Sequence, residues 1–167
     1  MKIKLFLASV AIVASSLVVY SQDYSSLKDI VLKDTSDYPK AEGKVLECAS
    51  YLLSTPLDDN NINRKYAIQL IIRWMTGTPA YTFGIDQSIT QISKSNASIL
   101  LLYMACMSKY ALENKENSKD PKEMKYNSML LLISYVEDSN HKVKIDGELK
   151  KLIQAKKQDK LKQYLKI

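Results

Sequence analysis

Apolar side chains recur at three- and four-residue spacing along most of the chain after residue 39, which is the period of one buried helix face. The first such segment opens at Pro39 and is stopped by Pro56. The second follows a run of capping residues at 58 to 61 and ends at Gly77, which we expect to act as a helix C-cap. Its stripe consists of Ile62, Tyr66, Ala67, Leu70, Ile71, Trp74 and Met75.

The remaining pattern predicts further helices joined by short connections. Ile85, Ile89 and Ile92 mark a brief helix. The segments from 100 to 112, with caps at 95 to 98, and from 121 to about 137 are apolar over such a wide surface that both are expected between neighbours. Asp146 can cap a last helical stretch that reaches Leu165. No segment alternates with strand period, and segments 40 to 76 and 96 to 137 share no repeat. The fold class predicted is all-α: a single-domain antiparallel helix bundle or stacked helical hairpins, with five to seven helices.

The N-terminus has the order of a signal peptide. Lys2 and Lys4 precede an apolar run from residue 5 to 19 that is interrupted only by serines. A membrane anchor is the alternative, but a bilayer core needs roughly 20 apolar residues and this run is shorter. We therefore expect residues 1–22 to be a signal peptide, with cleavage after Ser21 or near residues 14 to 16. The protein is then exported, to the periplasm or beyond, and residues 23–167 form the helical domain.

Charge is concentrated at the C-terminus. The formal net charge is +6, and segment 141–167 holds nine lysines against three acidic residues, so the rest of the exported chain is nearly neutral. A solvated helix face explains such a segment, and contact with an anionic membrane or envelope surface is the alternative. Nucleic acid is not expected as a partner, because the segment has no arginine and few aromatic residues.

Cys48 and Cys106 are the only cysteines. Export allows a disulfide between them if their two helices touch, whereas their places beside apolar stripes favour two buried thiols. A reactive or metal-binding role is a third alternative for these thiols.

Other polar residues have ordinary structural explanations. The single histidine, His141, is expected to be a solvated loop residue, and no metal site is predicted around it. The acidic pairs Asp58 with Asp59 and Glu137 with Asp138 stand at helix ends, which favours capping over acid–base catalysis or calcium binding.

The segment from residue 73 to 86 is the best candidate site in the sequence. It combines the only tryptophan and one of two arginines with further aromatic, hydroxyl and glycine residues, which is the composition of a small-ligand pocket. The alternative is that its aromatic residues close the core and hold the loop. The candidate ligand-binding residues are Arg73, Trp74, Thr78, Tyr81, Phe83 and Asp86. No nucleophile elbow, phosphate-binding loop or zinc motif is present, so no catalytic residue and no cofactor is assigned.

Three stretches resemble a family of small secreted or periplasmic all-helical proteins of Bacteroidota-type bacteria: the leader end Ser21–Gln22, the segment 47 to 53, and the segment 72 to 83. The last reads Ile-Arg-Trp-Met-x-Gly-Thr-Pro followed by Tyr81-x-Phe83. The resemblance implies export and helical structure, and it brings no reaction, cofactor or catalytic residue.

These observations favour a non-enzymatic exported protein that binds a partner protein, a peptide or a small ligand. An envelope enzyme of hydrolase type with its site in the 73 to 86 loop is one alternative. A structural protein that associates with an anionic surface through its lysine-rich C-terminus is the other.

Overall fold

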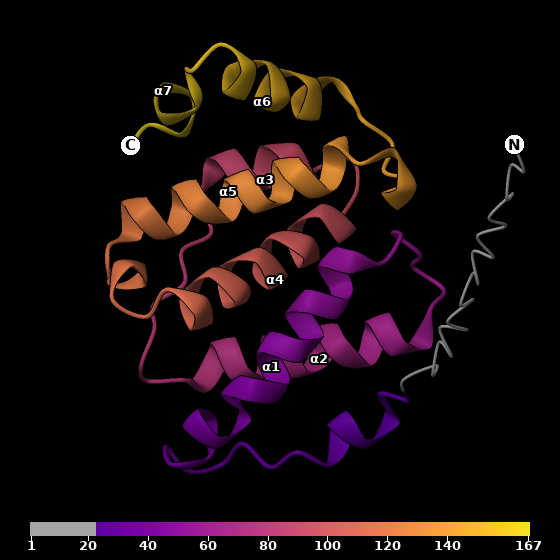
Figure 1. Ribbon diagram of the computed structural model, residues 1–167, viewed down its shortest axis with the longest axis vertical. Helices are drawn as coiled ribbons and strands as arrows, with labels where there is room; N and C mark the ends of the chain where they lie inside the picture. The colour runs from indigo at the N-terminus through magenta and orange to yellow at the C-terminus, as the bar shows by residue number, and fades with distance from the viewer. Residues whose placement is uncertain (1–22) are drawn as a thin grey trace, which may run out of the picture.

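The protein is built of helices. A computed structural model describes residues 23–167, and in that range it contains seven α-helices, three short 3-10 helices and no β-strand (Figure 1). The all-α prediction is confirmed, with a helix count at the upper end of the expected range. The expected signal peptide lies outside the described residues. The helices are η1 (Ser25–Asp29), α1 (Asp37–Ser54), α2 (Ile62–Gly77), α3 (Gln87–Ser93), α4 (Ser98–Glu113), η2 (Asn117–Lys119), α5 (Pro121–Glu137), η3 (Ser139–His141), α6 (Gly147–Lys157) and α7 (Leu161–Leu165).

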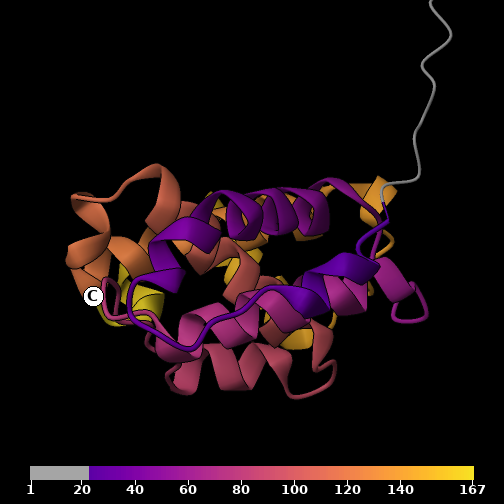
Figure 2. The same ribbon diagram turned by 90° about the horizontal axis from the view of Figure 1, so that it is seen from below.

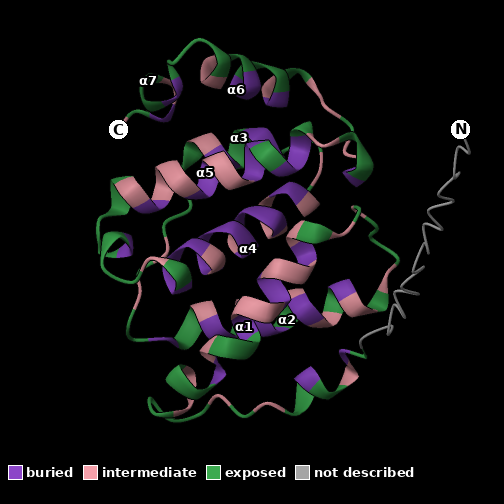
Figure 3. Ribbon diagram, in the orientation of Figure 1, coloured by how far each residue is buried: buried purple, intermediate pink, exposed green. Residues whose placement is uncertain are grey.

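Helix α4 lies at the centre of the molecule. It packs against α1, α2, α3 and α5, and its ribbon is mostly buried (Figure 3). This confirms the central position that its wide apolar surface predicts. Helices α6 and α7 cover the far side of α5, so α5 is also enclosed by neighbours (Figure 1). Among the helices of residues 23–167, none has the length and apolarity needed to cross a bilayer.

The buried side chains form two clusters that meet at α4. The N-terminal core joins η1, α1, α2 and one side of α4; the C-terminal core joins α3, α5, α6 and α7 to the other side. Met75, Tyr81, Phe83 and Met104 pack against both cores. The N-terminal core consists of Tyr24, Leu27, Ala41, Val45, Cys48, Ala49, Leu52, Ala67, Leu70, Ile71, Trp74, Ala105 and Leu112.

Several helix ends agree with the capping residues in the sequence. The side chains of Asn61, Asp120 and Asp146 accept hydrogen bonds from backbone N–H groups in the first turns of α2, α5 and α6. The last helical stretch is not continuous, however. It breaks between α6 and α7, where Asp159 has a positive φ of 56° that ends the first helix.

Gly77 has a different role from the one expected. No glycine in the described range has a positive φ, so Gly77 is not a left-handed cap. Instead, a Cβ atom at this position would lie 1.9 Å from the hydroxyl oxygen of Tyr38. A larger residue here would displace the Tyr38 ring, which crosses the end of α2.

Candidate functional site

Of the residues that the sequence selects between 73 and 86, Arg73 bonds to the segment before α1 (residues 25 to 36, the entry segment), and the three aromatic residues pack against each other. Arg73 is exposed, and its guanidinium donates hydrogen bonds to the carbonyls of Lys28 and Ile30. Those carbonyls belong to η1 and the segment that follows it, which runs across α2 (Figure 2). The structure therefore uses Arg73 to hold the entry segment on α2.

Trp74, Tyr81 and Phe83 do come together, as a cluster of tilted rings. The Trp74 ring centroid lies 5.5 Å from that of Tyr81 and 5.7 Å from that of Phe83. Trp74 is fully buried, and its indole N–H donates to the carbonyl of Tyr38 at 3.2 Å. Thr78, also buried, accepts a hydrogen bond from the Ala80 N–H. The aromatic rings fill the junction between the two cores. This is the arrangement expected if these residues close the core and hold the loop instead of forming a ligand pocket.

Asp86 lies apart from this cluster. It caps α3, accepts hydrogen bonds from Ser88 and forms an ion pair of 2.5 Å with Lys125 of α5. Burial opposes ionisation of Asp86, but the bonds from Lys125 and Ser88 outweigh it and lower the pKa of its carboxyl. The residue joins α3 to α5.

The two cysteines are free, buried thiols in the structure, one on α1 and one on α4. Burial raises the pKa of Cys48 to about 12 and also raises the pKa of Cys106. Because the thiolate is the reactive form, neither residue has the character of a nucleophile. The range 23–167 contains no group of three or more His, Cys, Asp or Glu side chains able to hold a metal ion.

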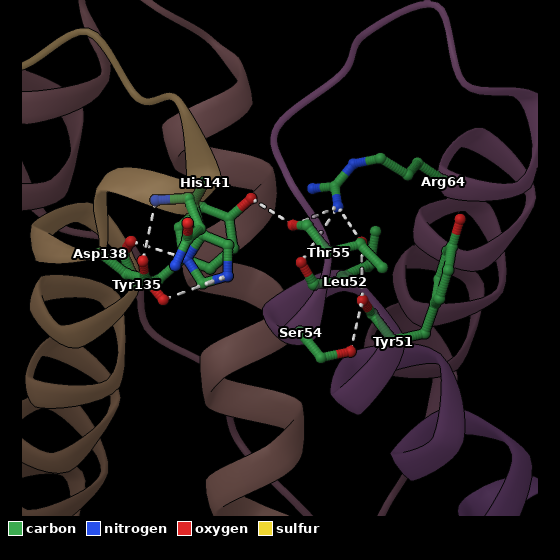
Figure 4. A network of polar contacts seen from close by, with 9 residues as sticks. Tyr51, Leu52, Ser54, Thr55, Arg64, Tyr135, Asp138 and His141 are labelled. Carbon is green, nitrogen blue, oxygen red and sulfur yellow. Dashed lines mark hydrogen bonds and ion pairs between the residues drawn. The ribbon is translucent and has the colours of Figure 1, made fainter. Parts of the chain in front are cut away.

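A buried polar network joins the α1–α2 corner to the end of α5 (Figure 4). At its centre is Arg64, whose side chain is 7% exposed. Its Nη1 atom donates to the carbonyl of Leu52 at 3.1 Å, to the carbonyl of Thr55 at 3.3 Å and to the hydroxyl of Thr55 at 2.7 Å. These acceptors stand at the C-terminal end of α1, where backbone carbonyls lack helical partners and a cation is favourable. Arg64 thus fixes the end of α1.

The other side of the network is formed by α5 and η3. The Tyr135 hydroxyl donates to the Thr55 carbonyl at 2.8 Å, and the His141 ring stacks on the Tyr135 ring with centroids 3.9 Å apart (Figure 4). Burial raises the pKa of the Tyr135 hydroxyl, with the nearby Arg64 opposing, so this phenol remains a donor. The backbone N–H of Leu57 donates to the His141 carbonyl at 2.9 Å. The prediction of a solvated loop histidine is wrong, because His141 is only 9% exposed and is packed into this network.

A pocket of about 260 Å³ opens beside Arg64, between the end of α1, the first turns of α2 and the start of α4. Its volume lies just below the roughly 300 to 1,000 Å³ typical of small-molecule sites. The lining is mainly aliphatic, and the aliphatic residues are Leu52, Leu57, Ile68, Leu101 and Leu102.

Polar residues surround the mouth of this pocket. Asp58, Asp59 and Lys65 line it and are exposed, so their opposite charges are solvated. The Asp58 carboxylate accepts from the Asn60 N–H at 2.9 Å, and that of Asp59 accepts from the Ser98 hydroxyl at 2.6 Å. The second bond closes the α1–α2 loop onto the start of α4. Arg64 is the one buried charged residue among those that line the pocket.

The sequence contains a signal for the burial of Arg64 that the predicted apolar stripe of this helix does not include. Residues 64, 67, 71 and 74 follow the three- and four-residue spacing of a buried helix face, and all four are buried on α2. The predicted stripe instead began at Ile62, which is 54% exposed. A charged residue in register with a core stripe marks a buried ionic group, and here that group stands beside a pocket.

Comparisons with known proteins give no further guide to this site. No family model matches the chain, and neither a curated protein nor a solved structure matches it significantly.

Proposed function

We propose that this chain is an exported, non-enzymatic binding protein that holds a small, largely apolar ligand in the pocket beside Arg64. The observation that carries the proposal is the pocket itself: five aliphatic side chains from α1, α2, α4 and the α1–α2 loop line it. Polar residues stand at its mouth, and small-molecule sites have this combination of an apolar interior and a few placed polar groups. Export is supported by the basic and then apolar order of residues 2 to 19.

The walls of the pocket are held in place without a ligand. Arg64 ties the end of α1 to α2, the Ser98–Asp59 bond ties the loop to α4, and the Leu57–His141 bond ties the loop to η3. A site whose walls are already fixed loses little conformational entropy when it binds. This favours binding as the function of the pocket.

A neutral apolar fluorophore tests the proposal. N-phenyl-1-naphthylamine should bind the full chain with a gain in fluorescence, and Leu101→Trp should weaken that binding by about tenfold because the larger ring occupies the pocket. Leu100→Trp is the matched control, since Leu100 precedes it on α4, is also half-buried and does not line the pocket. Circular dichroism checks that both variants keep their helices. Equal binding by the two variants, or no binding by the unmodified chain, would contradict the proposal.

A further inference from the structure

We infer that the ligand of this pocket carries a carboxylate, or an anionic group of the same size, that pairs with Arg64. The inference rests on the proposed function and names the chemical class of its ligand: an aliphatic carboxylate, with its chain against the leucines and its charge at the guanidinium.

The first support is the unbalanced charge of Arg64. Its side chain is 7% exposed, and no carboxylate among residues 23–167 forms an ion pair with it. A buried cation is costly unless an opposite charge or a full set of hydrogen bonds compensates it. The pocket is the place from which a ligand can supply that opposite charge.

The second support is the way in which the guanidinium is used. An arginine has five N–H donors in a planar fork. Three of its hydrogen bonds leave from Nη1, toward Leu52 and Thr55 (Figure 4). Capping of α1 therefore uses the Nη1 atom of Arg64. Arg64 also forms a side-chain hydrogen bond with Tyr135. The remaining N–H donors of the fork can pair with a carboxylate, which takes two parallel bonds from an arginine.

The acidic residues at the mouth would by themselves favour a cationic ligand. Asp58 and Asp59 are exposed, and each carboxylate already accepts a hydrogen bond from a neighbouring N–H or hydroxyl group. Lys65 stands beside them and offsets part of their charge. Solvated charges of mixed sign discriminate weakly between ligands, whereas a buried charge discriminates strongly. The buried guanidinium therefore decides the sign.

Three probes with the same chain separate these ligand classes: octanoate, octan-1-ol and octylammonium, each titrated into the full chain by calorimetry at pH 7. We expect octanoate to bind at least about tenfold more tightly than octan-1-ol, and octylammonium to bind most weakly. Because this comparison uses the unmodified chain, it does not depend on whether an Arg64 variant folds. Equal binding of octanoate and octan-1-ol, or tighter binding of octylammonium, overturns the carboxylate inference and leaves the proposed apolar pocket standing. Failure of all three, together with failure of the fluorophore, removes both.

Variants then assign the preference to Arg64. Arg64→Gln should abolish the advantage of octanoate over octan-1-ol while it retains the binding of octan-1-ol. Lys65→Gln is the matched control, because it removes the adjacent exposed cation and should leave the ratio of the two affinities within about twofold. If Lys65→Gln removes the advantage and Arg64→Gln does not, the charge that recognises the ligand is at the mouth and the inference is wrong.

Discussion

The two arginines of the chain stand on the same helix and have opposite environments. Arg64 and Arg73 are nine residues apart on α2, which places them on opposite sides of a helix with 3.6 residues per turn. Both guanidinium groups donate to backbone carbonyls of a preceding segment. Arg73 does so at the surface, beside a seam that aromatic rings fill. Arg64 does so in the interior, beside an open pocket. A similar hydrogen-bonding pattern therefore holds the segment before α1 in one place and fixes the wall of a pocket in the other.

The comparison teaches that aromatic and glycine content alone does not identify a pocket. In the 73 to 86 segment, the three aromatic rings pack at the junction of the two cores, and Gly77 leaves room for the Tyr38 ring that crosses the end of α2. Its composition therefore serves packing. The α1–α2 corner has an ordinary composition, but its leucines stop short of filling the space that Arg64 and the loop enclose. Unfilled space beside a buried charge is the stronger sign of a site.

The largest effect is expected from Trp74→Ala, which tests whether the region around Arg73 is packed core. Loss of a fully buried indole should lower the free energy of unfolding by about 3 to 5 kcal/mol. Trp74→Phe should cost distinctly less, since it keeps a ring against Tyr81 and Phe83. Urea denaturation followed by circular dichroism measures both. A loss below about 1 kcal/mol for Trp74→Ala would show that this region is not a packed core.

An intermediate effect separates the two arginines directly. Arg64→Gln should lower the free energy of unfolding by about 2 to 3 kcal/mol, because buried carbonyls at the end of α1 lose a charged donor. Arg73→Gln should cost less than about 1 kcal/mol, because its partners are exposed and can bind water. The same denaturation experiment compares them. Equal losses would mean that the burial of Arg64 has no energetic consequence.

The smallest effect concerns Asp86, at the other end of the 73 to 86 segment. The pKa of its carboxyl is lower in the folded protein than its ordinary value of 3.8, so its stabilising effect is complete above pH 3.8 and is lost as the pH falls through the folded-state value. Since this side chain is 50% exposed, Asp86→Asn should cost less than about 1 kcal/mol at pH 7. The difference from the unmodified chain should shrink as the pH falls below 3.8. Thermal unfolding at pH 7 and at pH 2.5 measures it, and Lys125→Met provides the partner variant. An effect independent of pH would assign the role of Asp86 to helix capping through its shape alone.

Helical spacing in the sequence was sufficient to predict the fold class and most of the helices. The stripe at 67, 70, 71 and 74 is buried as its period requires, and the capping residues Asn61, Asp120 and Asp146 mark real helix starts. These features depend on residues within one or two turns of each other. Helix periodicity and capping can therefore be predicted from the local sequence.

The pocket and its network could not be predicted in the same way. Tyr135 and Thr55 are 80 residues apart, and no local pattern indicates that they meet. His141 was expected in solvent for the same reason. The ring that covers it comes from the preceding helix, and the N–H group that donates to its backbone carbonyl comes from Leu57 of the α1–α2 loop. A pocket forms where side chains from different helices leave space unfilled. Its presence therefore depends on how the helices pack together.

The bond between Leu57 and His141 has a consequence for the order in which the protein matures. A polypeptide is synthesised from its N-terminus, so α1, α2 and α4 are complete before the residues that hold the α1–α2 loop from behind have been added. A nascent chain that ends before η3 has the leucines and Arg64 but lacks the support for one wall of the pocket. Under the proposed function, we therefore expect ligand binding only once η3 has been synthesised.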